Sequence, residues 1–199
     1  MFCEGGCSGC ANCGFMVARV GERAPDFKME AVMPEGDFLE RFGEVSLAKN
    51  MKAKKWTVLY FYPADFTFVC PTEIRRFNEL YAKFKAEGAE LIACSTDSTF
   101  CHLNWQEGSL GRLDHPHAAD RNQEVSAAYG VLDAEKGLAW RGTFIISPDG
   151  ILKSASINHG EIGRNVDEVL RTLQAAKAEA EGKLMGCNWQ PGEESLTKG

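Results

Sequence analysis

The sequence predicts an α/β protein in which a central mixed β-sheet is flanked by helices. Three observations favour this fold class. A short apolar run over 57–62, rich in β-branched and aromatic residues, is typical of a buried strand. The amphipathic run that starts at Pro71 has helical periodicity. Two later apolar runs flank Pro148-Asp149-Gly150, a segment typical of a tight turn between paired strands.

The first predicted strand, 57–62, leads into a predicted helix over 71–87. Proline is favoured at the first position of a helix, so Pro71 suits the start of this one. Gly88 suits its end. Its apolar face is made of residues at helical spacing, which are Ile74, Phe77, Tyr81 and Phe84.

The middle of the chain continues the alternation of strands and helices. We expect a strand over 89–96 and helices over 99–107 and 121–129. The order strand, helix, strand predicts parallel pairing with right-handed crossovers. We expect His115-Pro116-His117 to form a surface turn rather than a metal pair, because proline separates the two rings and no third ligand is close in sequence.

The last third predicts a hairpin and a terminal helix. Strands over 141–147 and 151–157 are joined by the turn, and a helix follows over 164–181. Asn165 is a candidate N-cap, and Gly182 ends this helix. Its apolar face consists of Val166, Val169, Leu170 and Leu173. The complete layout is close to a thioredoxin-like arrangement.

Composition divides the 199 residues into three parts. Residues 1–16 form an N-terminal arm rich in glycine and cysteine, 17–182 carry the strand and helix pattern, and 183–199 form a polar tail. The length fits one domain with a proper core. The net charge of −6 argues against a nucleic-acid surface. We see no apolar run long enough for a membrane span and no secretory signal, so we expect a cytoplasmic protein.

Eight cysteines in a reducing compartment indicate catalysis, redox sensing or metal binding. Cys70 is the most informative because it lies at or near the N-terminus of the predicted helix that Pro71 opens. Helix N-termini favour anions, and the thiolate is the reactive form of cysteine. Cys94 and Cys101 are expected to be small residues of the core or of a helix.

Several chemistries of a reactive thiol find no support in the sequence. An acyl-transfer enzyme would need a histidine base, and a thioredoxin-type dithiol would need a second cysteine two residues further on. The sequence links none of the histidines to Cys70; these are His102, His115, His117 and His159. Attack on a peroxide remains, which gives a sulfenic acid that a second thiol captures.

The segment Pro63-x-x-x-Thr67-x-x-Cys70, followed by Pro71-Thr72-Glu73, resembles the peroxidatic signature of the peroxiredoxins. It is most similar to the typical two-cysteine class, which includes the C component of alkyl hydroperoxide reductase. The resemblance covers roughly 17–199. Other segments match the family in order, namely 20–27, 95–105, 141–146 and 163–168.

The resemblance implies a role for each matching residue. Cys70 would be the peroxidatic nucleophile, Thr67 would present its hydroxyl to the peroxide and the sulfur, and Pro63 would shield the pocket from water. Arg141 would stabilise the thiolate and polarise the peroxide. The residues that would brace Arg141 are Glu73 and Arg164.

The resemblance also implies a resolving cysteine near the C-terminus, supplied by the partner subunit. The family places it four residues before a tryptophan, a position that Met185 occupies here. Cys187 lies two residues before Trp189. We expect Cys187 to resolve the Cys70 sulfenic acid, with a different thiol as the alternative.

The N-terminal arm does not belong to the family pattern. Its four cysteines could bind zinc or an iron–sulfur cluster, could resolve or reduce Cys70, or could have no fixed role. They are Cys3, Cys7, Cys10 and Cys13.

We therefore expect a thiol peroxidase that reduces hydrogen peroxide and organic hydroperoxides and needs no organic cofactor. The resemblance implies homodimers that assemble into a decamer, with a thioredoxin-like or flavoprotein disulfide reductase as electron donor. Two alternatives remain. One is a non-enzymatic redox sensor or holdase chaperone, and the other is a metal or cluster carrier that uses the N-terminal arm.

Overall fold

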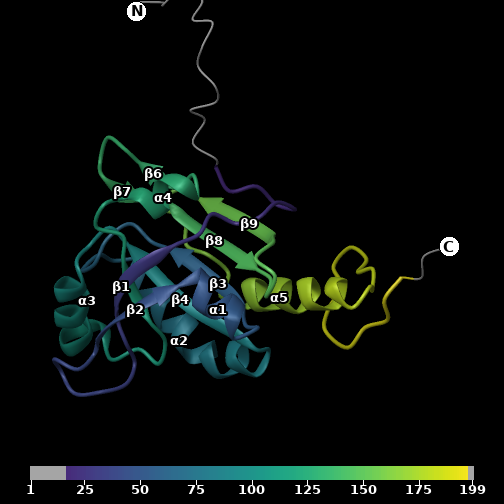
Figure 1. The fold of residues 1–199 in the computed structure, drawn as a ribbon, viewed down its shortest axis with the longest axis horizontal. Helices are drawn as coiled ribbons and strands as arrows, with labels where there is room; N and C mark the ends of the chain where they lie inside the picture. The colour runs from purple at the N-terminus through teal and green to yellow at the C-terminus, as the bar shows by residue number, and fades with distance from the viewer. Residues whose placement is uncertain (1–16, 197–199) are drawn as a thin grey trace, which may run out of the picture.

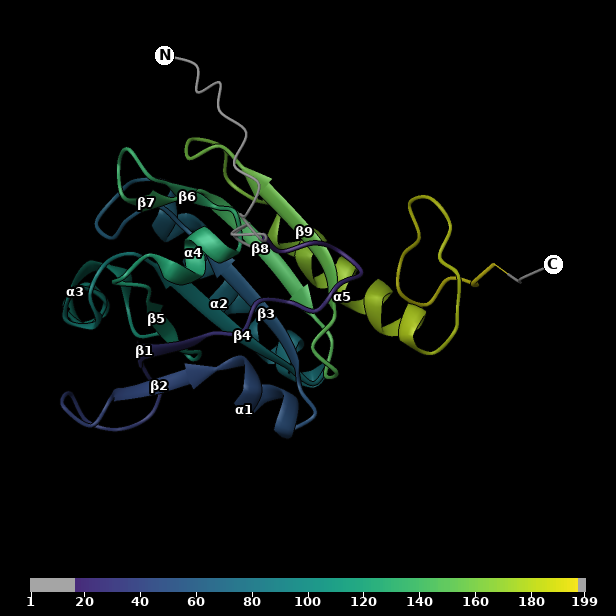
Figure 2. The same cartoon turned by 45° about the horizontal axis from the view of Figure 1, so that its top comes forward.

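The computed structural model describes residues 17–196. A seven-stranded sheet forms its centre, in the order β2-β1-β5-β4-β3-β8-β9, and helices cover both of its faces (Figures 1 and 2). The predicted fold class, a mixed sheet flanked by helices, is confirmed. The strands of the sheet are β1 (Lys28–Val32), β2 (Phe42–Ser46), β3 (Trp56–Phe61), β4 (Ala89–Ser95), β5 (His117–Ala119), β8 (Arg141–Ile146) and β9 (Leu152–Asn158).

The helices alternate with the strands along the chain. They are α1 (Leu47–Lys52), α2 (Cys70–Ala86), α3 (Thr99–Trp105), α4 (Glu124–Ala128) and α5 (Val166–Ala180). A π-helical turn, η1 (Gln106–Leu110), extends α3, and β6 (Leu132–Asp133) pairs with β7 (Leu138–Ala139) outside the main sheet. None of the helices in the described part of the chain is both long and apolar enough to cross a bilayer.

Strand pairing follows the predicted topology. β3 and β4 are parallel, as are β4 and β5, whereas β8 and β9 form the predicted antiparallel hairpin. The antiparallel pair β1 and β2 was not predicted, because β2 has the sequence Phe-Gly-Glu-Val-Ser, which lacks regular apolar alternation.

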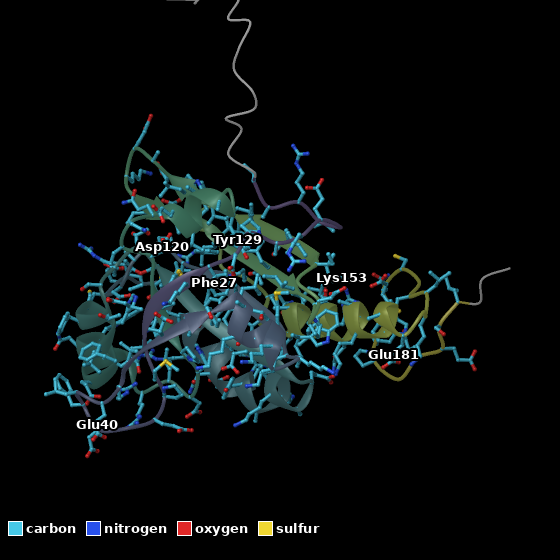
Figure 3. The ribbon with its side chains drawn as sticks, viewed as in Figure 1. Phe27, Glu40, Asp120, Tyr129, Lys153 and Glu181 are labelled. Atoms are coloured by element: carbon cyan, nitrogen blue, oxygen red, sulfur yellow. The ribbon has the colours of Figure 1, made fainter. Side chains whose placement is uncertain are left out.

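Alternate side chains of the central strands enter two separate cores, as the period of a strand requires. Val58 and Tyr60 of β3 pack with α2 and α5, whereas Leu59 and Phe61 face the opposite layer. In this second core the rings of Phe27 and Tyr129, labelled in Figure 3, meet edge to face with centroids 6.4 Å apart. β3, the strand that precedes Cys70 in the sequence, is therefore packed on both faces.

The prediction of a surface turn at His115-Pro116-His117 is wrong. His115 and His117 are 1% and 0% exposed, and His117 begins β5. β5 lies between β1 and β4 in the interior of the sheet, so neighbouring strands cover it on both edges. A strand of three residues is too short for its periodicity to be recognised in the sequence.

Candidate active site

Cys70 is the first residue of α2, directly after the loop that leaves β3. The helix thus starts one residue earlier than predicted. Among the described residues no side chain caps this end of α2, and the Cys70 side chain is 1% exposed. The free N–H groups of a first helical turn attract anions. The backbone therefore directs donor groups toward the position of the sulfur.

Arg141 brings a positive charge to the sulfur from a neighbouring strand. It is the first residue of β8, and its Nη1 donates a hydrogen bond to Cys70 Sγ at 3.4 Å. Its Nε donates to the carbonyl oxygen of Gly160 at 2.7 Å, which fixes the guanidinium. Because the group is buried, its charge acts on the sulfur with little screening by solvent.

Glu73 holds Arg141 in place from the first turn of α2. Its carboxylate accepts from Arg141 Nη1 at 2.5 Å, from Arg164 Nε at 2.9 Å and from the Arg164 backbone N–H at 2.7 Å. Burial alone would raise the pKa of Glu73. The hydrogen bonds and charges of Arg164, together with the charge of Arg141, hold that pKa below its usual value. Glu73 is therefore an anion between two cations.

Arg164 is itself fixed by its surroundings. Its guanidinium lies over the rings of Tyr60 and Phe77, 5.3 Å and 5.7 Å from their centroids, and its Nη1 donates to the Gly142 carbonyl at 2.8 Å. Two guanidinium groups and one carboxylate leave a net charge of about +1 beside the sulfur. The sequence placed these three residues in three separate segments, and the fold brings them together.

A cavity of about 310 Å³ opens beside Cys70. Pro63, Thr67 and Arg141 line it together with the sulfur, so every predicted catalytic residue except Cys187 meets there. Thr67 is exposed, and its hydroxyl donates to the Ala64 carbonyl at 2.9 Å. Much of the remaining wall is apolar, contributed by Phe68, Val69, Leu138, Ala139 and Trp140.

One residue of this cavity was missed from the sequence. His159, which the sequence did not link to Cys70, lines the cavity and stacks on Trp140 with ring centroids 4.9 Å apart. It follows the end of β9, and the antiparallel pairing of β9 with β8 places it near Arg141. No periodicity or spacing in the sequence indicates this position.

Cys187 lies far from Cys70 within the same chain. It is an exposed free thiol in the tail that follows α5. The nearby Trp189 lines the same surface hollow as Glu87, the C-cap of α2. The backbone carbonyl of Trp189 accepts a hydrogen bond from Arg171 at 2.9 Å. Cys70 stands at the other end of α2, whose 17 residues span about 25 Å at the rise of an α-helix.

The other described cysteines have the surroundings of inert thiols. Cys94 is fully buried in β4, as predicted, and burial raises its pKa well above the ordinary value. Burial and the nearby Asp65 carboxylate raise the pKa of Cys101 to about 12. The predicted metal or cluster ligands lie outside the described residues; they are Cys3, Cys7, Cys10 and Cys13.

A buried polar cluster beside the active-site loop was also missed. Ligand atoms of Asp65, His102 and His117 lie within 4.8 Å of one another, a separation that a metal ion could bridge. The Tyr62 hydroxyl, however, already lies among them, since it donates to Asp65 at 2.6 Å and contacts the Nε2 of His117. An ion could bind only if this hydroxyl moved away.

Residues 20–155 match the AhpC/TSA family. A Bacillus subtilis (strain 168) protein assigned as a peroxiredoxin, YkuU, is 50% identical over 182 residues, which are 89% of this chain and 97% of that protein. The thioredoxin peroxidase of Trypanosoma brucei rhodesiense is 43% identical over 185 residues, 90% of each protein.

Solved structures agree with the sequence relatives. The reduced 2-Cys peroxiredoxin of Plasmodium vivax superposes with a TM-score of 0.82 at 38% identity, covering 88% of this chain and 91% of the other. AhpC of Enterococcus faecalis gives a TM-score of 0.76 at 36% identity, covering 83% and 96%. The predicted thioredoxin-like fold is thereby confirmed.

Proposed function

This chain belongs to the AhpC/TSA family and is a thiol-dependent peroxidase of the peroxiredoxin type, and we propose that Cys187 of a second subunit completes its catalytic cycle. The observation that carries the peroxidase function is the contact of Cys70 with Arg141 at 3.4 Å beside an open cavity. The substrates that fit this cavity are hydrogen peroxide and organic hydroperoxides, whose alkyl groups would pack against its apolar wall.

The first step is nucleophilic attack on the peroxide. The Cys70 thiolate attacks the terminal oxygen, the O–O bond breaks, and a sulfenic acid forms on the sulfur. The departing alkoxide or hydroxide takes a proton from solvent and leaves as alcohol or water. Donors from Arg141 and Thr67 at the cavity wall would orient the peroxide and stabilise the negative charge that develops on the leaving oxygen. No organic cofactor is needed for this step.

The second step is capture of the sulfenic acid by another thiol. Cys187 attacks the Cys70 sulfur, water leaves, and a disulfide forms. A disulfide requires the two Cα atoms to approach within about 7 Å, whereas α2 separates the two regions of one chain by about 25 Å. The Cys187 of a second subunit therefore fits this role better than the Cys187 of the same chain. Cys70 must also leave its buried position, which requires local unfolding of the first turn of α2.

A homodimer through β9 would bring two copies together. β9 is an edge strand whose outer side pairs with no strand of residues 17–196, and only its first residue, Leu152, bonds there to the backbone of Gly21 and Glu22. The side chains of 155–157 are exposed there. Antiparallel pairing of β9 with the β9 of a second subunit, related by a two-fold axis, would give hydrogen-bond partners to the remaining backbone N–H and C=O groups of this edge. Exposed aromatic residues of the active-site loop and of α3 support a further contact between dimers, one that would close a decameric ring; these are Phe66, Phe68 and Phe100.

A dithiol reductant would close the cycle by reducing the disulfide. The name of the Trypanosoma relative, thioredoxin peroxidase, supports a thioredoxin-like donor. A flavoprotein disulfide reductase is the second candidate. Sustained peroxide consumption with either donor would oppose a purely non-enzymatic role as a redox sensor or holdase chaperone.

The experiment that tests the proposal treats the reduced protein with one equivalent of hydrogen peroxide and maps the disulfides by mass spectrometry. A bond between Cys70 and Cys187 of two subunits supports it. A bond from Cys70 to a cysteine of the N-terminal arm would make that arm the resolver and overturn the role of Cys187. The arm thiols are Cys3, Cys7, Cys10 and Cys13.

A complementation assay tests whether resolution crosses the dimer. Cys70→Ser and Cys187→Ser subunits should each be inactive with a dithiol donor. A mixed dimer holds one intact pair, Cys70 of one subunit with Cys187 of the other, and one pair with neither thiol. It should therefore have about half the activity of a wild-type dimer. Resolution within one chain predicts no recovery on mixing.

A further inference from the structure

A cluster of buried polar side chains lies beside the loop that carries Pro63 and Thr67, and none of its members has a role in the two reaction steps described above. Tyr62, His102 and His117 are 0% exposed, Gln106 is 3% exposed and Asp65 is 7% exposed. Buried polar groups are costly unless their hydrogen bonds are satisfied. All buried polar side-chain atoms of the described residues have a partner, so the cluster is a complete network.

The direction of the hydrogen bonds can be followed from one end. The Gln106 Oε1 accepts from the Leu113 backbone N–H at 3.2 Å and from the Nη2 of Arg41. The amide nitrogen of Gln106 therefore faces the Nδ1 of His117, at 3.1 Å, and donates to it. Since Nδ1 accepts, the proton of a neutral His117 is on Nε2.

His117 then fixes the Tyr62 hydroxyl. The Nε2–H of His117 donates to the hydroxyl oxygen, which leaves the Tyr62 proton free to be donated to Asp65 Oδ1 at 2.6 Å. Burial, and then the nearby His102, His115 and Arg41, lower the pKa of His117 well below its ordinary value, which agrees with a neutral ring. A protonated His117 would clash with the donor of Gln106.

Asp65 is the end point of the network. Its Oδ2 accepts from His102 Nδ1 at 2.8 Å, and the other nitrogen of His102 is 3.1 Å from the Ala118 carbonyl oxygen. The rings of His102 and His117 stack with centroids 3.8 Å apart. Donors from two sides thus hold one carboxylate that projects from the active-site loop.

The segment that Asp65 holds is strained. Phe66, the next residue, has φ of 56°, a left-handed conformation that residues other than glycine rarely adopt. Its exposed ring packs on Trp105, with centroids 5.7 Å apart. Without an anchor at Asp65, the loop would relax and move both Pro63 and Thr67, each two residues from Asp65.

We propose that His117 is a positioning residue for the peroxidase reaction, acting through Tyr62 and Asp65 on the loop over 63–69. It holds the strained loop in the conformation in which Pro63 and Thr67 line the cavity beside Cys70. Loss of the network would favour the opened loop, in which Cys70 reacts slowly with peroxide but is accessible to the resolving thiol. The inference rests on the proposed function, since it assigns a residue to the same reaction.

The test separates the two half-reactions in three variants. His117→Leu removes both hydrogen bonds, Tyr62→Phe removes the hydroxyl but keeps the ring, and His117→Gln keeps an acceptor for Gln106 and a donor for Tyr62. Stopped-flow fluorescence measures the oxidation of Cys70 by hydrogen peroxide, and quenched-flow alkylation measures the later formation of the disulfide.

We expect His117→Leu and Tyr62→Phe to slow the oxidation of Cys70 about tenfold, the equivalent of one buried hydrogen bond. Disulfide formation should be unchanged or faster. His117→Gln should restore most of the oxidation rate. Ser126→Ala is the matched control, because it removes a buried hydrogen bond of 2.7 Å from α4 to Asp120 that does not belong to the network, and it should leave both rates unchanged.

Two outcomes would overturn the inference. One is an unchanged oxidation rate in folded Tyr62→Phe, the variant that carries the test if His117→Leu does not fold. The other is an equal slowing of both half-reactions, with no rescue by His117→Gln, which would indicate a general loss of stability. If the wild-type protein itself does not react with peroxide, the proposed function fails instead.

Discussion

Arg141→Leu should slow the reaction of Cys70 with hydrogen peroxide by about two to three orders of magnitude. The guanidinium lies 3.4 Å from the sulfur. At that separation and an effective dielectric constant of 20, the attraction between two unit charges is about 5 kcal/mol. Glu73 accepts from the same nitrogen at 2.5 Å and offsets part of this attraction.

The charges of the cluster set the net effect. Arg141, Arg164 and Glu73 sum to about +1 beside the thiolate, and removal of Arg141 leaves a neutral Arg164–Glu73 pair. We expect about 3–4 kcal/mol of the attraction to be lost, which corresponds to the predicted decrease in rate of two to three orders of magnitude. Arg141→Lys retains the charge but not the hydrogen bond to the Gly160 carbonyl, and it should slow the oxidation of Cys70 about tenfold.

The assay is stopped-flow oxidation under pseudo-first-order conditions, accompanied by alkylation of Cys70 with iodoacetamide. Alkylation reports the reactivity of the thiolate without peroxide activation, so the two rates separate stabilisation of the sulfur from polarisation of the peroxide. An urea titration shows whether the variant is folded. If folded Arg141→Leu oxidises within about threefold of the wild-type rate, the electrostatic account of this site is refuted.

Three further predictions concern stability and metal content. Glu73→Gln should lower the free energy of unfolding by about 3 kcal/mol in urea titrations, because two buried guanidinium groups lose their counter-charge; an unchanged midpoint would contradict this. Burial lowers the pKa of His115 from 6.5 to about 4. The unfolded chain takes up its proton below pH 6.5, so this contribution to stability is complete above pH 6.5 and is lost as the pH falls to about 4. His115→Leu should therefore show a smaller decrease in the urea midpoint between pH 7 and pH 4.5 than the wild type, and an equal decrease would show that His115 is not responsible. Elemental analysis of anaerobically purified protein should find stoichiometric zinc or iron if the N-terminal arm binds a metal, and its loss on Ser substitution would identify the ligands; a metal-free protein would leave thiol exchange or no fixed role for Cys3, Cys7, Cys10 and Cys13.

Local signals in the sequence were sufficient to single out Cys70 as the candidate nucleophile and to predict the main elements of the fold. Pro71 after Cys70 marks a helix start, and an apolar run before the loop marks a buried strand. These features depend on neighbours within a few residues. They located α2 to within one residue at its start and correctly paired β8 with β9 through their turn.

The arrangement of the charged residues was predicted only through resemblance to a family. Glu73, Arg141 and Arg164 are separated by tens of residues, and nothing in periodicity links them. The antiparallel pairing of β3 with β8 places Arg141 against the start of α2, and the loop before α5 supplies Arg164. Two cations and an anion in one buried site are stable only because the fold completes their hydrogen bonds.

The polar network behind the loop was decided by tertiary structure alone. His117 is an interior residue because β5 inserts between β1 and β4, a consequence of sheet order that three residues of sequence do not encode. Tyr62 and His102 meet it from a strand end and a helix. The sequence by itself singled out Cys70 as the candidate nucleophile and predicted the helix that presents it, because helix initiation is local. Long-range strand pairing decided which charges surround that sulfur and which buried groups hold its loop.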